Sequence, residues 1–93
     1  MNEKEIKKLS KFFKALAHPV RIMIVKELLD EKRCVGDIEQ KLELKQSNIS
    51  QHLIILKSAD IVDYKQDGNK KCYYLNNPDV IQKILDILQK EDN

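Results

Sequence analysis

The spacing of apolar residues changes along the chain, and this change limits the fold more than any other feature. Up to about residue 59, and again after residue 78, apolar side chains recur mostly every three or four residues, which is the helical period. Residues 61–66 and 71–75 instead alternate between apolar and polar side chains, as strands do. Asp67, Gly68 and Asn69 lie between these two segments and tolerate the positive φ of a tight hairpin. The sequence therefore predicts a mainly α-helical chain with one small β-hairpin.

Pro19 divides the first apolar segment into two helices. Proline biases the preceding residue away from helix and is tolerated at a first helical position. We therefore expect one helix over about 3–17 and a second over about 20–29. The second helix is apolar around much of its circumference, which indicates the centre of the core. Its mostly inward residues are predicted to be Ile22, Ile24, Val25, Leu28 and Leu29.

Further elements are expected between the second helix and the hairpin. Residues 32–35 are too few for a helix and partly β-branched, which indicates one isolated strand. Gly36 and Asp37 open a third helix. Ser47 is expected to cap a fourth helix over about 47–59, because its hydroxyl can accept a free amide of the first turn.

The complete order predicts a winged helix-turn-helix fold. It reads helix, helix, possible short strand, helix, helix, two hairpin strands and a last helix near Pro78. Three helices followed by a hairpin make the winged helix-turn-helix, here with an extra helix at each end. The hairpin over 63–75 is the wing, and its Tyr74 is expected to pack inward.

The chain length suits one domain over residues 1–93. Apolar residues make up 42% of the sequence, which supplies one core. Seventeen Lys and Arg against fifteen Asp and Glu give a net charge of only +2. A protein that binds duplex DNA usually carries more positive charge, since phosphate neutralisation supplies most non-specific affinity. The positions of the cations therefore matter more than their number.

The sequence indicates a cytoplasmic protein without a membrane partner. Its first residues, MNEKEIKKLSKFF, contain no long uncharged apolar run of the kind that a signal peptide needs. No stretch approaches the roughly 18 consecutive apolar residues that span a bilayer.

The fourth predicted helix carries a face suited to reading DNA bases. The side opposite Ile49, Leu53 and Leu56 holds uncharged hydrogen-bonding residues near its N-terminal end. Glutamine can bind adenine through two hydrogen bonds, and serine can donate or accept. On the wheel this side carries Ser47, Gln51 and Ile54, flanked by Asn48 and Ser50. The alternative is an ordinary solvated face, because polar outer faces are the norm for helices.

The wing supplies a second candidate contact. Lys65, Lys70 and Lys71 cluster on it with Gln66 and Asn69, which suits phosphate or minor-groove contact. Lysines on a hairpin also protect exposed sheet edges from pairing, and this is the alternative interpretation.

The terminal helices, about 3–17 and 78–91, carry more apolar surface than so small a domain buries alone. The last helix has adjacent apolar pairs, a stripe wide enough to face two neighbours. We therefore expect a homodimer formed through these two helices. Its two recognition helices would lie about one DNA turn apart and bind a palindromic operator.

The chain resembles the ArsR/SmtB family of small repressors. The motifs that carry the resemblance are LAHPVRIMIVKEL (16–28), CVGDI (34–38), LKQSNISQHLIILKSADIV (44–62) and DYKQDGNKKCYYL (63–75). The resemblance implies a dimeric DNA-binding repressor that leaves its operator when an inducer binds. It places recognition contacts at Gln46, Ser47, Asn48, Ser50, Gln51 and His52, and wing contacts at Lys70 and Lys71.

The sequence departs from metal-sensing relatives at both of their usual sites. Many such members carry a CxC pair near the start of the third helix, where this chain has Cys34, Val35 and Gly36. Others bind zinc through histidines and carboxylates of the last helix, which here has Asp79 and Asp86 but no histidine. We therefore predict no metal and no cofactor, and the inducer is unknown.

Cys34 and Cys72 are the only cysteines and suggest a redox signal instead. In winged helices the short strand pairs with the second hairpin strand, so these residues become neighbours. A thiol pair joining sheet and wing would report oxidants or reactive sulfur by reshaping the wing. The alternative is two separate, half-buried thiols without a role, since cytosolic thiols usually stay reduced. His18 is expected to be a helix-junction residue rather than a ligand, and His52, beside the buried stripe, is expected to pack or to contact a phosphate.

Other functional classes remain to be distinguished from a DNA-binding regulator. A winged helix can serve purely as a protein-interaction module, and its test is the absence of salt-dependent duplex affinity. An enzyme is excluded because we find no nucleophile–base pair, glycine-rich phosphate loop or carboxylate cluster. Single-stranded RNA binding needs an exposed aromatic platform, which only Tyr64 or Tyr73 would provide here.

Overall fold

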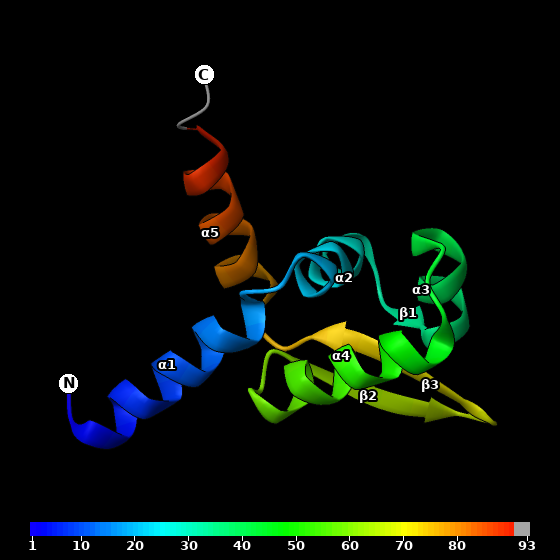
Figure 1. The fold of residues 1–93 in the computed structure, drawn as a ribbon, viewed down its shortest axis with the longest axis horizontal. Coiled ribbons are helices and arrows are strands. Elements are labelled where there is room, and N and C mark those ends of the chain that lie inside the picture. The colour runs from blue at the N-terminus through cyan, green and yellow to red at the C-terminus, as the bar shows by residue number, and fades with distance from the viewer. Residues whose placement is uncertain (91–93) are drawn as a thin grey trace.

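The elements follow the predicted order of a winged helix-turn-helix (Figure 1). The computed structural model describes residues 1–90. Within them the elements are α1 (Glu3–Leu16), α2 (Pro19–Asp30), β1 (Arg33–Cys34), α3 (Val35–Leu42), α4 (Gln46–Ser58), β2 (Val62–Asp67), β3 (Lys70–Leu75) and α5 (Pro78–Lys90). Residue 91, which the sequence assigned to the last helix, lies outside the described residues.

Side chains fix the starts of the first two helices. Asn2 Oδ1 accepts from the N–H of Glu5 at 2.8 Å, and Glu5 Oε1 accepts from the N–H of Asn2 at 3.1 Å. This reciprocal pair satisfies two amides that α1 would otherwise leave free. Pro19 is the first residue of α2, and Nδ1 of His18 accepts from the N–H of Val20 at 3.1 Å. The predicted break at Pro19 is thus confirmed.

The sheet is antiparallel in the order β1-β3-β2. The wing hairpin pairs Val62 with Leu75 at its base and Asp67 with Lys70 at its tip. Gly68 in the tip has φ 62°, a left-handed conformation that glycine adopts without strain. The short β1 pairs with β3, which makes β3 the central strand.

The core lies between α2, α3, the inner side of α4 and the sheet. Its fully buried residues include the predicted stripe of α4, Ile49, Leu53 and Leu56, each at 0% exposure. These residues pack with Ile24 of α2 and Ile38 of α3. The helix-turn-helix is therefore held on the scaffold by apolar burial.

The structure corrects two details of the sequence analysis, the exposure of Ile22 and the start of the fourth helix. Ile22 of α2 is 38% exposed, because it turns toward the side of α1 and α5 rather than toward the core. Ser47 does not cap α4, since the carbonyl of Lys45 already accepts from Asn48 and Ile49 at 3.1 Å each. The helix therefore begins at Gln46 with Lys45 as its N-cap.

The tyrosines of the wing also differ from expectation. Tyr73 is buried at 6% exposure, whereas Tyr74, expected to pack inward, is half-buried. Tyr73 lies on the central strand opposite Tyr64, with ring centroids 5.3 Å apart. Pairing across the hairpin therefore covers Tyr73, and the wing presents no open platform formed by these two rings.

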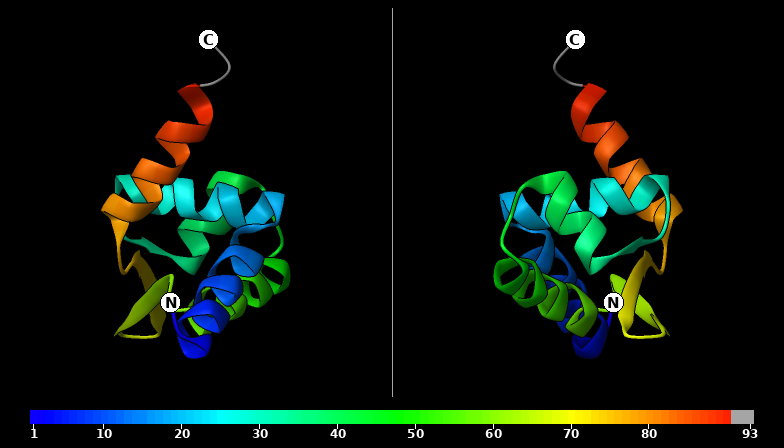
Figure 2. Two further views of the ribbon diagram at one scale, coloured as in Figure 1. Left: turned by 90° about the vertical axis from the view of Figure 1, so that its left-hand side faces the viewer. Right: turned by 90° about the vertical axis from the view of Figure 1, so that its right-hand side faces the viewer.

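The ends of the molecule point in different directions. α5 rises away from α2, while α4 and the wing lie together on the other side of the molecule (Figures 1 and 2). α1 extends from the body past α4. No helix within residues 1–90 has the length and apolar character needed to cross a membrane.

Candidate nucleic-acid interface

The outer face of α4 is polar and accessible. Gln46, Ser47, Asn48 and Gln51 are exposed, and Ser50 is half-buried. A short turn positions this face. α3 ends at Leu42, the next residue Glu43 reverses the chain with a φ of 55°, and α4 starts three residues after Glu43. The predicted recognition residues of α4 thus lie together in its first two turns, except for His52, described below.

A groove separates α4 from the wing. It has a volume of about 490 Å³. Its walls come from α4, the start of α3 and the hairpin. They include Gln46, Ser50 and Ile54 of α4, Cys34 to Asp37, and Gln66, Asn69, Lys70, Lys71 and Tyr73. Two of the predicted recognition residues, Gln46 and Ser50, therefore share one concave surface with Lys70 and Lys71 of the wing.

The wing lysines are free to bind an external anion. Lys65, Lys70 and Lys71 are exposed, and none forms an ion pair with a carboxylate within residues 1–90. Lys71 Nζ lies 4.8 Å from the ring centroid of Tyr64, which holds this cation beside the hairpin. The wing thus carries exposed positive charge although the net charge of the whole chain is low.

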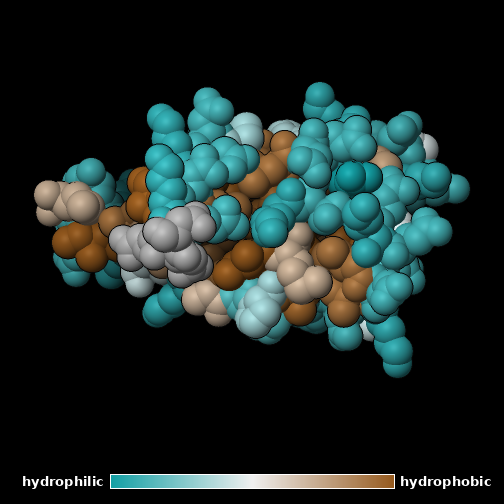
Figure 3. Space-filling view, turned by 90° about the horizontal axis from the view of Figure 1, so that it is seen from above, coloured by the Kyte–Doolittle hydropathy of each residue, from teal (hydrophilic) through white to brown (hydrophobic). Residues whose placement is uncertain are grey.

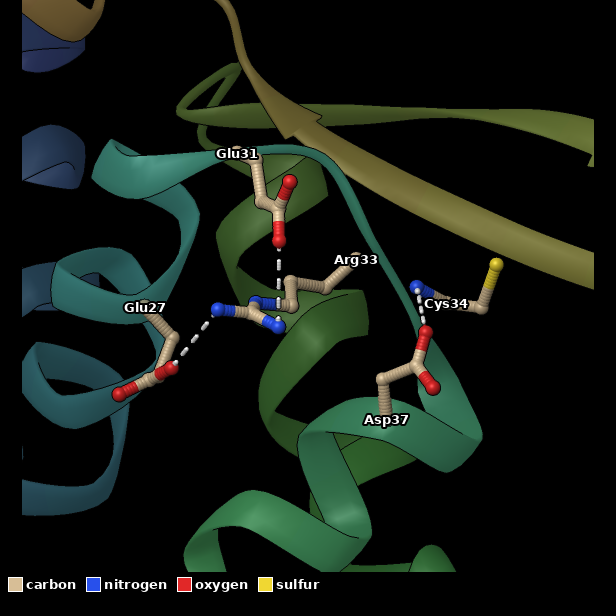
Figure 4. Close-up of polar contacts among 5 residues, drawn as sticks. All are labelled: Glu27, Glu31, Arg33, Cys34 and Asp37. Atoms are coloured by element: carbon tan, nitrogen blue, oxygen red, sulfur yellow. Dashed lines mark hydrogen bonds and ion pairs between the residues drawn. The ribbon is translucent and has the colours of Figure 1, made fainter.

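Three polar contacts tie the short strand β1 to the end of α2 and the start of α3 (Figure 4). Arg33 forms ion pairs with Glu27 at 3.6 Å and with Glu31 at 3.4 Å, at the end of α2. The N–H of Cys34 donates to Asp37 Oδ2 at 3.4 Å, at the start of α3. The start of the helix-turn-helix is thereby linked to α2.

Cys34 and Cys72 form a disulfide between β1 and β3. They stand directly opposite each other in the register of the sheet, with a Cα–Cα distance of 3.7 Å. The predicted adjacency of the two cysteines is confirmed. Because Cys34 lines the groove and precedes α3 directly, the bond joins the helix-turn-helix to the wing.

A second surface of the molecule is apolar. Residues of α1, α2 and α5 surround a hollow of about 320 Å³. Its lining residues are Phe13, Leu16, Ala17, Ile22, Val25, Ile81, Ile84, Leu85 and Leu88. Nearby side chains stay exposed, among them Ile87 at 65% and Leu88 at 64%. Figure 3, which views the molecule from the α5 side, shows hydrophobic patches between hydrophilic side chains.

Comparison with known proteins identifies the family. The profile described as "Bacterial regulatory protein, arsR family" matches residues 18–64, from the N-cap of α2 into the wing. The HTH-type transcriptional regulator Rv0081 of Mycobacterium tuberculosis is 38% identical over 76 residues, which are 81% of this chain and 67% of that protein. The chain belongs to the ArsR family. It is therefore a winged helix-turn-helix transcriptional regulator.

Solved structures and other relatives agree with this assignment. The crystal structure of Rv0081 superposes with a TM-score of 0.79 over 96% of this chain and 89% of that one. The biofilm growth-associated repressor of Agrobacterium fabrum is 33% identical over 92% of this chain and 73% of its own length. A homodimeric winged helix-turn-helix DNA-binding domain from Mycobacterium bovis shares the fold, with a TM-score of 0.86 at 22% identity, over 99% of this chain and 90% of that one.

The two histidines of this ArsR-family chain lie against each other. The ring centroids of His18 and His52 are 4.5 Å apart, so His52 turns toward the start of α2 instead of the outer face of α4. Its Nδ1 is buried without a hydrogen-bond partner in the structure. Burial lowers the pKa of His52 below its ordinary value of 6.5, and the neighbouring His18 and Arg21 lower it further.

The ligand set does not fit a metal ion. Within residues 1–90, no three His, Cys, Asp or Glu side chains lie close enough to hold one. A structural zinc site needs about four such ligands. The two cysteines are used in the disulfide, and the histidine pair lacks a carboxylate partner.

Sequence reasoning missed part of the site. It did not foresee that Arg33 anchors β1 to α2 or that residues 35–37 line the groove. Little in the sequence indicated the Arg33 ion pairs, because the spacing of Glu27, Glu31 and Arg33 is common among surface charges. Ile54 was placed on the outer side of α4 but not counted among the contacts.

We expect the stability of the protein to fall as the pH drops below about 6.5. Because the pKa of His52 is lower in the folded protein than in the unfolded chain, the unfolded chain takes up the proton more readily as the pH falls, so acid favours unfolding. Urea unfolding of wild type and His52→Gln between about pH 5 and pH 8 checks this. The free energy of unfolding of His52→Gln should fall less with acid than that of wild type. An identical fall in both proteins would show that His52 is not its cause.

Proposed function

We propose that this chain represses transcription by binding a palindromic duplex operator as a homodimer. The observation that carries the proposal is the groove in which α4 and the lysines of the wing face each other. The uncharged end of α4 suits base edges in the major groove, which admits one helix. The lysines of the wing suit the phosphate backbone or the adjacent minor groove.

The two parts of this surface have different tasks. Gln51 is exposed on the outer side of α4 and offers a donor and an acceptor for bidentate recognition of a base. Lys70 and Lys71 offer charge without base preference. A winged helix used only for protein interaction needs neither a base-reading face nor unpaired cations beside it.

The division of tasks predicts distinct mutational effects. Gln51→Ala should weaken operator binding by about 1–3 kcal/mol and leave random duplexes nearly unaffected. Lys70→Ala and Lys71→Ala should weaken every duplex similarly, and each should lower the slope of log K against log salt by about one. Fluorescence anisotropy over a salt series measures both. Absence of salt-dependent duplex binding by wild type would instead support the interaction module.

The apolar surface of α1, α2 and α5 supports the homodimer. It carries exposed side chains on α1 and α5 around one hollow. Apolar patches of this kind mark interaction sites on soluble proteins. The relative from Mycobacterium bovis is itself a homodimer. A second copy of this chain would cover both helices and pair two α4 helices for two operator half-sites.

A charge placed on this surface should break the dimer. Leu88→Glu puts an unpaired carboxylate in the hollow, which is costly once the surface is covered. Sedimentation should then show a monomer with weakened operator binding. Gln89→Glu introduces the same charge at the next exposed residue and should remain dimeric. A dimeric Leu88→Glu protein would place the interface elsewhere.

We further propose that the Cys34–Cys72 bond sets the affinity for DNA. Only two register pairs join β1 to β3, and the disulfide fixes one of them. With the bond closed, wing and helix-turn-helix are held in one arrangement, which lowers the entropic cost of binding. A dithiol opens the bond by supplying two electrons and two protons, and closes its own disulfide in return.

The disulfide form should bind operator more tightly than the dithiol form. Pre-organisation worth about 1 kcal/mol corresponds to roughly fivefold in Kd. Anisotropy titrations with diamide-treated and dithiothreitol-treated protein test this. The Cys34→Ser, Cys72→Ser double variant should bind equally under both conditions. Equal binding by both forms of wild type would leave the cysteines without a regulatory role.

A further inference from the structure

Ile54 is an apolar side chain in the middle of a polar surface. It is 60% exposed, more than any other large apolar residue of the helix-turn-helix. It follows Ser47 and Gln51 on one side of α4, at helical spacing of seven and three residues. This side is opposite the buried stripe of Ile49 and Leu53. A partner that binds to this side of α4 and contacts Gln51 therefore also contacts Ile54.

The dimer surface does not account for Ile54. The apolar hollow proposed for dimerisation is lined by α1, α2 and α5 and contains no residue of α4. Ile54 is also absent from the hydrophobic residues that pack on the core. It instead lines the groove between α4 and the wing, together with Gln46 and Ser50.

Cations border Ile54 on both sides. On the wing side the groove contains Lys70 and Lys71. On the other side, a hollow of about 270 Å³ between α1 and α4 is lined by Ile54 together with Lys11, Lys14 and Arg21. The partner that reaches Ile54 therefore passes between two positively charged borders, as a major groove with a phosphate strand on each edge would.

We infer that Ile54 recognises the 5-methyl group of a thymine. The cations on both sides of Ile54 favour a partner with negatively charged edges. Between these edges, the partner should present an apolar group to the side chain of Ile54. The thymine methyl is the apolar group that base pairs present in the major groove. A β-branched side chain is stiff at χ1, so little conformational freedom is lost on contact. This inference rests on the proposed DNA binding and adds a base that the polar residues of α4 do not specify.

The spacing along α4 locates this thymine. Ile54 is three residues after Gln51, an advance of about 4.5 Å along the helix axis. Successive bases on a strand are about 3.4 Å apart. The thymine should therefore lie within one or two base pairs of the base that Gln51 contacts, once in each half-site.

The test removes only the methyl group. A duplex is selected from a random-sequence library by wild-type protein, and each thymine is replaced in turn by deoxyuridine. One replacement per half-site should weaken wild-type binding roughly three- to fivefold, the effect of one buried methyl-sized group. The same replacement should leave the affinity of Ile54→Ala unchanged, because its contact is already lost.

Two controls separate this effect from general damage. Ile54→Ala removes an exposed side chain, so its thermal unfolding should match that of wild type. Ser58→Ala changes an exposed residue one turn further along the same helix and should keep the full sensitivity to deoxyuridine. Loss of that sensitivity in Ser58→Ala would overturn the assignment to Ile54.

The outcomes distinguish the inference from the function on which it rests. Equal effects of deoxyuridine on wild type and Ile54→Ala, or no effect on either, would overturn the thymine contact alone. A selected site without thymine near the position of Gln51 would do the same. Failure to enrich any duplex from the library would overturn the proposed DNA binding itself.

Discussion

The burial of one side of α4 is the constraint on which the surface chemistry depends. Ile49, Leu53 and Leu56 have no exposed area, and they pack against α2 and α3. This contact fixes the rotation of α4 about its axis, because turning the helix would expose all three side chains. The direction of Gln51 and Ile54 is therefore a consequence of the core. A polar face held in this way is pre-organised for recognition without its own supporting hydrogen bonds.

Charge distribution then determines which partner this face suits. The chain carries a net charge of only +2, yet the lysines of the wing form no ion pairs within residues 1–90. Acidic side chains are used elsewhere, as in the pairing of Glu27 and Glu31 with Arg33. The cations beside the groove thus stay unpaired because no carboxylate within residues 1–90 lies in ion-pair range of them. A nearly neutral domain can present a basic surface by this means.

Local patterns predicted most of the fold, whereas contacts between distant side chains escaped prediction. Helical spacing, Pro19 and the Gly68 turn are signals within a few residues, and the structure confirms each. The adjacency of Cys34 and Cys72 also followed from strand order alone. The stacking of His18 on His52 depends on how two helices cross, which spacing within either helix does not specify.

The errors have similar physical causes. Ser47 has good capping chemistry, but the carbonyl of Lys45 had already begun the helix. Tyr73 and Tyr74 are adjacent on β3 and point to opposite sides of the sheet, so the packing on each side decides which ring is buried. The DNA contacts on α4 and the wing could be predicted because their residue types suit bases and phosphate, and they stay predictions. The part that residues 35–37 take in lining the groove was not predicted, because these residues have no distinctive chemistry.

The disulfide also gives the chain a covalent ring. Thirty-eight positions separate Cys34 from Cys72, and the enclosed segment contains α3, α4 and β2. The chain-entropy model assigns a loop of this size roughly 4 kcal/mol of stabilisation, through restriction of the unfolded chain. The helix-turn-helix and half of the wing are thus restrained even when α1, α2 and α5 unfold. The covalent restraint therefore acts on a segment that excludes α1 and α5, the helices that we propose for dimerisation.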